Sequence, residues 1–196
     1  MIAVITGDIV KSRSEDPGIW LPILEEAIAV YADTYDVFRG DSFQLEVPLD
    51  KVFTAAFYIK ATMIEAGLDV RLGIGIGEKD YRSPHIKTTF GSALIYSGEA
   101  FDELKKETLY LKSPDTEFDA LCNTILPLLS EICHRWTPNI AETVKVALKH
   151  EGANQVELAK ILQKKYQSQV SIALQKAGFS KIRQALDYCT TQLLNL

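Results

Sequence analysis

The pattern of hydrophobic and polar positions predicts alternating strands and helices over the first part of the chain. Residues 2–6 (IAVIT) form a continuous apolar run, typical of a strand that is buried on both faces. Residues 20–31 place hydrophobic side chains at helical spacing, and residues 37–47 (VFRGDSFQLEV) read as two strand-like runs joined by a turn. A second helix is predicted over residues 50–65, with Asp50 as its N-cap.

The next segments continue the alternation. Residues 69–76 (DVRLGIGI) read as a strand whose glycines predict the close approach of another backbone or of a ligand. A helical pattern follows over residues 92–106, and a short strand over residues 108–112. The order β-α-β-β-α-β-α-β predicts an α+β fold, in which residues 1–113 form a ferredoxin-like antiparallel sheet domain with an extra helix and edge strand.

The rest of the chain is predicted to be helical. A connector helix is expected over residues 114–137, followed by an all-α domain over residues 138–196. Within that domain, residues 154–176 carry the spacing of a helix-turn-helix. The inner faces of its two helices would carry Leu158, Ala159, Leu162, Val170, Ala173 and Leu174.

Charge is distributed unevenly along the 196 residues. The formal net charge of −5 at pH 7 argues against bulk attraction of nucleic acid by the whole chain. Residues 154–196, however, hold six Lys and Arg against two acids, so this segment carries +4, which leaves −9 for residues 1–153. A basic segment on an acidic body indicates two modules with different partners.

The cysteines and the N-terminus bear on the cellular compartment. Three cysteines without CxxC spacing do not suit a disulfide framework, so we expect reduced thiols in a cytoplasmic protein. The start MIAVITGD has no basic leader region and reads as a first strand rather than as a signal peptide. No apolar stretch approaches membrane-spanning length, so no membrane partner is predicted.

Two aspartates of the first domain are candidate metal ligands. Asp8 is expected just beyond the strand over residues 2–6, and Asp41 lies in the turn of the hairpin over residues 37–47. If the first strand lies beside that hairpin, the two carboxylates meet. Such a pair is unfavourable unless a divalent cation such as Mg²⁺ or Mn²⁺ lies between them. The alternative is that Asp8 caps a helix and Asp41 only forms a turn.

The segment after Asp8 is a candidate phosphate site. Lys11, Ser12 and Arg13 come shortly before a predicted helix start, where cations and free backbone N–H groups can hold phosphate oxygens. The alternative interpretation is a solvated basic loop without a ligand.

These segments, in this order, resemble a known group of domains. The Asp-Ile pair at residues 8–9, the RGDSF hairpin at 39–43, RLGIGIG at 71–77 and GSALIYSGEA at 91–100 are similar to the core of class III nucleotidyl cyclases and GGDEF domains. With the start MIAVITGDIVKSR and a C-terminal helix-turn-helix, the chain more narrowly resembles the SatD family of small bacterial proteins.

The resemblance implies that Asp8 and Asp41 hold a metal ion, with the carbonyl of Ile9 as an accessory ligand. It also shows two departures from the cyclases, because the positions of their transition-state Asn and Arg fall on Ile95 and Glu99. An acid in place of an arginine would repel a triphosphate, so these residues do not predict cyclase catalysis. Three arginines are candidate substitutes: Arg13, Arg71 and Arg82.

The second helix of the predicted helix-turn-helix is a candidate DNA-reading element. Amide and hydroxyl side chains on its outer face suit base edges, and nearby lysines suit the DNA backbone. The candidate contact residues are Lys164, Lys165, Gln167, Ser168, Gln169, Ser171, Gln175 and Lys176. The pattern departs from the commonest motif because Gln163 stands where a turn glycine is usual, and because Ile172 places an apolar side chain on the DNA-facing side.

The leading interpretation is a DNA-binding transcriptional regulator, in which a degenerate cyclase-like domain binds a metal–nucleotide or similar ligand. A homodimer is expected, because helix-turn-helix proteins usually bind paired half-sites. The first alternative is a Mg²⁺-dependent nucleotidyl or phosphoryl transferase whose second domain serves assembly. The second alternative is a non-catalytic protein-interaction module.

Overall fold

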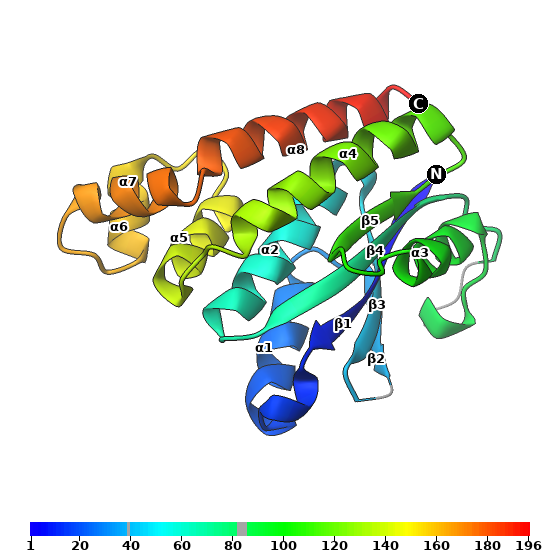
Figure 1. The fold of residues 1–196 in the computed structure, drawn as a ribbon, viewed down its shortest axis with the longest axis horizontal. Helices are drawn as coiled ribbons and strands as arrows, with labels where there is room; N and C mark the ends of the chain where they lie inside the picture. The colour runs from blue at the N-terminus through cyan, green and yellow to red at the C-terminus, as the bar shows by residue number, and fades with distance from the viewer. Residues whose placement is uncertain (39, 82–85) are drawn as a thin grey trace.

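The described residues build one five-stranded β-sheet. The computed structural model describes residues 1–38, 40–81 and 86–196. In the order β2-β3-β1-β4-β5, the sheet contains β1 (Ile2–Val10), β2 (Thr34–Phe38), β3 (Ser42–Val47), β4 (Asp69–Gly77) and β5 (Leu109–Lys112). Neighbouring strands are antiparallel except β4 and β5, which are parallel. The fold is therefore α+β with a mixed sheet (Figure 1).

The prediction of an antiparallel sheet is wrong at the last strand. β4 is followed by the helix α3 (Ser92–Asp102), which brings the chain back so that β5 runs in the direction of β4. Parallel neighbours need such a crossover, whereas antiparallel neighbours can be joined by a tight turn. The predicted neighbourhood of the first strand and the hairpin is confirmed, because β1 pairs with β3.

Helices cover both faces of the sheet. α2 (Val52–Glu65) packs on one face, and α1 (Pro17–Ala29) packs against α2. α3 lies on the opposite face, where Ala93 meets Val4 of β1. Because side chains alternate along a strand, Val4 reaches α3 whereas Ile5 joins the core beneath α2.

Three glycines of β4 explain how closely α3 approaches the sheet. Gly73, Gly75 and Gly77 share one face of the strand. A Cβ atom at Gly75 would lie 2.2 Å from both the carbonyl oxygen of Ala93 and the amide nitrogen of Ser97. Only glycine leaves room for the helix backbone at this distance. The close approach predicted from the sequence is therefore made by α3.

In the described chain, five further helices follow the sheet: α4 (Thr116–Cys133), α5 (Pro138–Lys149), α6 (Gln155–Ile161), α7 (Gln167–Lys176) and α8 (Phe179–Leu194). α4, α5 and α8 share the main hydrophobic core with the sheet and α2, through residues such as Cys122, Val144 and Leu186. A smaller core joins α6 and α7 to α5 and contains Ala147, Leu158, Ala159, Leu162 and Val170. The α6–α7 pair therefore attaches to the body mainly through α5, at the end of the molecule opposite α3 (Figure 1).

Two element boundaries differ from the predicted ones in ways that affect candidate residues. β1 continues to Val10, because β4 pairs with it that far, so Asp8 lies inside the strand and not beyond it. A 3₁₀ turn, Leu49–Lys51, precedes α2, so Asp50 does not cap this helix. Among the described helices, none has both the length and the apolar character needed to cross a lipid bilayer.

Candidate functional site

The strand register brings Asp8 and Asp41 together. Asp8 pairs with Ser42 across β1 and β3, and the backbone amide of Ile9 donates to the carbonyl oxygen of Asp41 at 3.2 Å. On its other side, Asp8 pairs with Arg71 of β4. The two candidate metal ligands therefore lie at one end of the three central strands, with an arginine beside them.

The side chain of Asp8 is held by Arg71 in a bidentate ion pair. The Nε atom of Arg71 donates to Oδ1 of Asp8 at 2.9 Å, and an Nη atom donates to Oδ2. The side chain of Asp8 is 17% exposed and that of Arg71 is 41% exposed. The guanidinium also lies 5.4 Å from the ring centroid of Phe101.

The hydrogen bond to Asp8 and the charges of Asp8 and Asp41 raise the pKa of Arg71 above its ordinary value, although burial acts in the opposite direction. Arg71 is therefore a fixed positive charge at the paired aspartates. Its positive charge offsets the negative charges of Asp8 and Asp41, which is the role expected of a divalent cation at this site.

Asp41 lies in a pocket with two of the predicted phosphate-binding residues. Ser12 donates through its hydroxyl to Oδ2 of Asp41 at 2.5 Å. The pocket has a volume of about 430 Å³ and is lined by Ser12, Arg13, Glu15, Pro17, Trp20, Gly40 and Asp41. Lys11 instead lines a separate pocket with Asp69 and His134. The structure thus brings Ser12 and Arg13 to Asp41 and directs Lys11 elsewhere.

Trp20 is a pocket residue that the sequence did not single out. Its side chain is 2% exposed, and its indole N–H has no hydrogen-bond partner among the described residues. A buried donor without a partner costs about 1–3 kcal/mol. In the sequence, Trp20 could have been recognised as a pocket residue only by its position near the start of the helix that follows Lys11, Ser12 and Arg13.

The donor set determines how well this site fits a metal ion. Across residues 1–38, 40–81 and 86–196, no group of three or more His, Cys, Asp and Glu side chains is arranged to hold one. Both carboxylates already have partners, Arg71 for Asp8 and Ser12 for Asp41. A Mg²⁺ or Mn²⁺ ion shared by Asp8 and Asp41 would therefore compete with Arg71 for the oxygens of Asp8. The metal site stays a prediction.

The two positions at which cyclases carry Asn and Arg lie on the surface of α3. The side chain of Ile95 is 60% exposed. The carboxylate of Glu99 pairs with the ammonium of Lys112 at 2.5 Å. Neither residue lines the pocket of Asp41.

Two of the three arginines that could replace the missing cyclase arginine lie near Asp8 and Asp41. Arg71 contacts Asp8, and Arg13 lines the pocket of Asp41. Arg82, like Arg39 of the hairpin, lies outside the described residues.

The helices α6 and α7 are linked by a well-defined turn. Asn154 caps α6, because its side chain accepts from the amide of Glu157 while the Glu157 carboxylate accepts from the amide of Asn154. After α6, Gln163 adopts a left-handed conformation with φ 53°, and the amide of Lys164 donates to the carbonyl of Ala159 at 2.9 Å. Glycine is usual at such a left-handed position, so Gln163 fills a glycine position with a side chain.

Most of the predicted DNA-contact residues are on the surface. The exposed ones are Lys165, Gln167, Ser168, Gln169, Gln175 and Lys176, and Ser171 is half-buried. On the opposite side of α7, Val170 and Ala173 are buried, as the sequence predicted. Ile172 is 52% exposed.

Lys164 and Gln169 are already engaged within the chain. The ammonium of Lys164 lies 2.9 Å from a carboxylate oxygen of Glu142 and 3.1 Å from the side-chain oxygen of Asn139. The side-chain oxygen of Gln169 accepts from the backbone amide of Tyr166 at 3.1 Å. Lys164 therefore holds the turn against α5, and Gln169 stabilises the start of α7.

Comparison with known proteins assigns no family to this chain. No protein-family model, no curated protein and no solved structure matches it. The candidate sites therefore depend on the geometry described above and on the order of short motifs in the sequence.

Proposed function

We propose that this protein is a DNA-binding transcriptional regulator of the SatD type. In this proposal the N-terminal part is a ferredoxin-like, cyclase-related domain, and α6 and α7 form a helix-turn-helix whose second helix enters the major groove. The observation that carries the proposal is the outer side of α7, where amide, hydroxyl and ammonium groups are exposed along the helix.

The dimensions of α7 support this role. Its 10 residues give a helix of about 15 Å, and the major groove of B-DNA, about 12 Å wide, admits an α-helix. Ser168 and Gln175 are exposed near the two ends of α7, and both side chains can donate and accept hydrogen bonds. Val170 packs into the small core with α6, which fixes the side that α7 turns outward.

The charges around α7 also support DNA binding. The exposed lysines of this region are Lys160, Lys165, Lys176 and Lys181. Such side chains suit phosphate oxygens and make binding depend on salt, since counterions are released from the DNA. Lys164 is left out of the proposed contact set because it pairs with Glu142.

A buried hydrogen bond connects the end of the proposed DNA-binding helices with α4, and a partly buried one holds α5 to the end of α1. The indole N–H of Trp136, which follows α4, donates to the carbonyl oxygen of Ala177 between α7 and α8 at 3.2 Å. The hydroxyl of Tyr31, which follows α1, donates to the carbonyl of Leu148 in α5 at 3.3 Å. These contacts support transmission of a ligand signal through packed helices instead of through a loose linker.

For the N-terminal part, the proposed ligand carries phosphate, as a nucleotide does. Arg13 and Ser12 would bind phosphate oxygens in the pocket of Asp41, with Trp20 in the pocket wall. Mg²⁺ or Mn²⁺ would enter with such a ligand, held by Asp8 and Asp41. No catalytic step is assigned, because Glu99 is an acid paired with Lys112 at the position where cyclases use an arginine.

The test of DNA binding uses the full chain and duplex DNA from upstream of its own coding region. Fluorescence anisotropy is measured at several salt concentrations for the wild type and for Lys176→Glu. We expect affinity to fall steeply with salt, and Lys176→Glu to weaken binding roughly tenfold, because it reverses a charge on α7. The matched control is Lys106→Glu, which reverses an exposed lysine between α3 and β5.

Equal losses in the two variants, or binding that does not respond to salt, would favour the interaction module. Formation of a cyclic nucleotide or dinucleotide from ATP or GTP with Mg²⁺ would favour the transferase. Light scattering tests the proposed homodimer, and a monomer bound to DNA with a single half-site would contradict it.

A further inference from the structure

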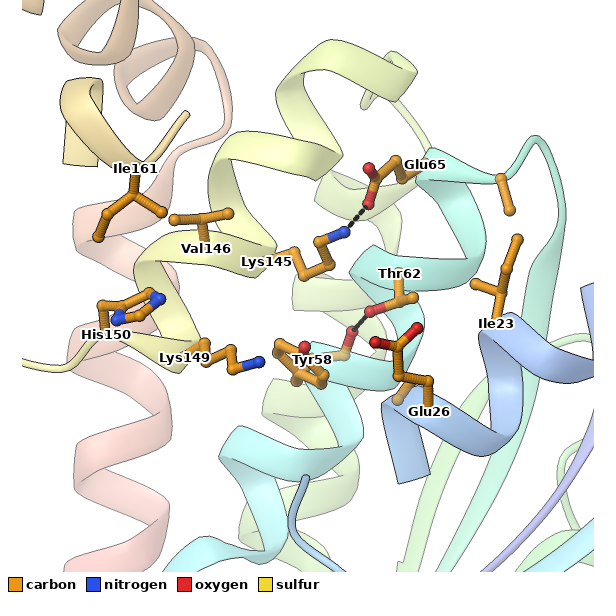
Figure 2. Close-up of a pocket in the computed structure, with 12 residues that line it drawn as sticks. Ile23, Glu26, Tyr58, Thr62, Glu65, Lys145, Val146, Lys149, His150 and Ile161 are labelled. Atoms are coloured by element: carbon orange, nitrogen blue, oxygen red, sulfur yellow. Dashed lines mark hydrogen bonds and ion pairs between the residues drawn. The ribbon is translucent and has the colours of Figure 1, made fainter. Parts of the chain in front are cut away.

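A second pocket lies where α1 and α2 meet α5 and the end of α6 (Figure 2). Its volume is about 520 Å³, within the range of roughly 300–1,000 Å³ that is typical of small-molecule sites. Its lining combines apolar side chains from Ile23, Val146 and Ile161 with polar groups from Glu26, Tyr58 and Lys149. It shares no lining residue with the pocket of Asp41.

The charged groups of this pocket comprise one ion pair and two side chains without an ion-pair partner in the described ranges. The ammonium of Lys145 lies 2.5 Å from a carboxylate oxygen of Glu65, so these two charges neutralise each other. Glu26 and Lys149, by contrast, form no ion pair with any residue in the described ranges. Figure 2 shows them on either side of Tyr58, Glu26 on α1 and Lys149 at the end of α5.

Tyr58 lines the pocket between these two charged side chains. Its ring packs edge-on against Tyr31, with 5.3 Å between the ring centroids. Burial, followed by the negative charges of Glu26 and Glu65, raises the pKa of Tyr58 above its ordinary value. The hydroxyl therefore keeps its proton and can donate to a ligand.

We propose that this pocket binds a small zwitterion with an apolar side group, either a free α-amino acid or a dipeptide. The carboxylate of the ligand would meet Lys149, and its ammonium would meet Glu26. Its apolar group would lie against Ile23, Val146 and Ile161.

Other ligand classes fit the lining less well. Glu26 and Lys149 are both exposed, so a purely anionic ligand would use Lys149 alone and a purely cationic one would use Glu26 alone. An uncharged apolar ligand would cover both charges without pairing either. Only a ligand that carries both an ammonium and a carboxylate can pair with Glu26 and Lys149 at the same time.

Ile161 is the last residue of α6, so the bound zwitterion would touch the proposed helix-turn-helix. An effect on DNA affinity follows only if the proposed DNA binding is correct. Binding of the zwitterion itself does not depend on that proposal.

Calorimetric titration of the full chain tests the inference with related probes: leucine, N-acetyl-leucine, leucinamide and the dipeptide dileucine. N-acetyl-leucine lacks the ammonium and leucinamide lacks the carboxylate. We expect leucine or dileucine to bind, and each singly charged probe to bind roughly tenfold more weakly or worse, as expected for the loss of a charged hydrogen bond. Tighter binding of leucine assigns an amino acid, and tighter binding of dileucine assigns a dipeptide.

Two variants assign the charges to their partners. Glu26→Gln should remove the preference for leucine over N-acetyl-leucine, and Lys149→Met should remove the preference over leucinamide. The matched controls are Glu25→Gln and Lys106→Met, which change exposed side chains outside the pocket and should keep both preferences.

The inference is overturned if neither leucine nor dileucine binds at about 10 mM, a concentration that would fill a site with a dissociation constant of about 1 mM. It is also overturned if all probes bind equally well, or if the pocket variants and the control variants behave alike.

Discussion

The ion pair between Asp8 and Arg71 determines whether the paired aspartates can take a metal ion. The informative change is Arg71→Met, because methionine keeps an apolar stem over the ring of Phe101 but removes the guanidinium. We expect this variant to be less stable than the wild type and to respond more strongly to a divalent cation.

The loss of stability follows from the contacts of Arg71. Hydrogen bonds to charged groups contribute about 1.5–3 kcal/mol, but solvent screening reduces this to about 1 kcal/mol for a side chain that is 41% exposed. The lost contact of the guanidinium with the ring of Phe101 adds about 0.5–1 kcal/mol. Arg71→Met should therefore lower the free energy of unfolding by about 1.5–2 kcal/mol. Asp8→Asn combined with Arg71→Met should cost less than the sum of the single changes.

The metal response is measured as thermal unfolding with and without MnCl₂. With Arg71 removed, Asp8 and Asp41 lose their positive neighbour, so Mn²⁺ has no competitor. At a tenfold excess over its dissociation constant, the ion should stabilise Arg71→Met by about 1.4 kcal/mol, more than the wild type. The double variant with Asp8→Asn should lose this response.

Two results would refute the reasoning. Equal stabilisation of the wild type and Arg71→Met by Mn²⁺ would show that Arg71 does not compete with the ion. If neither protein responds, Asp8 and Asp41 do not form a metal site, and the metal part of the proposed function fails.

Three further predictions concern a glycine in β4, the half-buried hydroxyl of Tyr31 and the left-handed residue Gln163. Gly75→Ala in β4 should lower the free energy of unfolding by about 3 kcal/mol or more, because the new Cβ would meet the backbone of α3. Gly98→Ala, at a position in α3 with open space around it, should raise the free energy of unfolding by about 0.5–1 kcal/mol. Losses of similar size in the two variants would contradict the close approach of α3 to β4. Burial raises the pKa of Tyr31 to about 12 from 10.0, so the unfolded chain ionises first and stability present below pH 10 is lost as the pH rises toward 12. Denaturant titrations at about pH 8 and about pH 11 should show less alkaline loss in Tyr31→Phe, by about 1 kcal/mol or less because solvent screens this half-buried group, but no such gain in Tyr188→Phe; an equal change in both would assign the loss elsewhere. Gln163→Gly should raise the free energy of unfolding by about 1 kcal/mol in the same titration, because φ is 53°, and a decrease would show that the side chain compensates for the strain.

That the backbone segments of Asp8 and Asp41 are neighbours could be predicted from the sequence, since it needs only a buried first strand beside a hairpin. The pairing of Asp8 with Arg71 could not. It depends on the register between β1 and β4, and a shift by one residue would turn Arg71 to the other face of the sheet. The glycines of β4 indicate a close neighbour but do not fix that register.

The contacts between distant segments were also beyond the sequence. Both the parallel pairing of β5 and the depth at which α3 packs depend on how a crossover folds back onto the sheet. The pocket of Glu26 and Lys149 forms only because α5 packs against α2, with its lining drawn from residues 23–66 and 145–161. Periodicity within a single helix predicts the apolar face of that helix but not which other helix will cover it.

A boundary at residue 138 would separate α5 and α8 from the main hydrophobic core that they share with the sheet. α5 and α8 are packed into the body with the sheet, so a ligand is not expected to move residues 138–196 as one unit. α6 and α7 lie instead in the smaller core, which they share with Ala147 near the end of α5. Two ion pairs hold the segment that follows α5. Glu151 pairs with Lys51, just before α2, at 3.3 Å and with Arg183 of α8 at 3.5 Å. If the protein is a regulator, the small rotation that would reorient α7 should therefore arise at this junction, next to the pocket that contains Lys149.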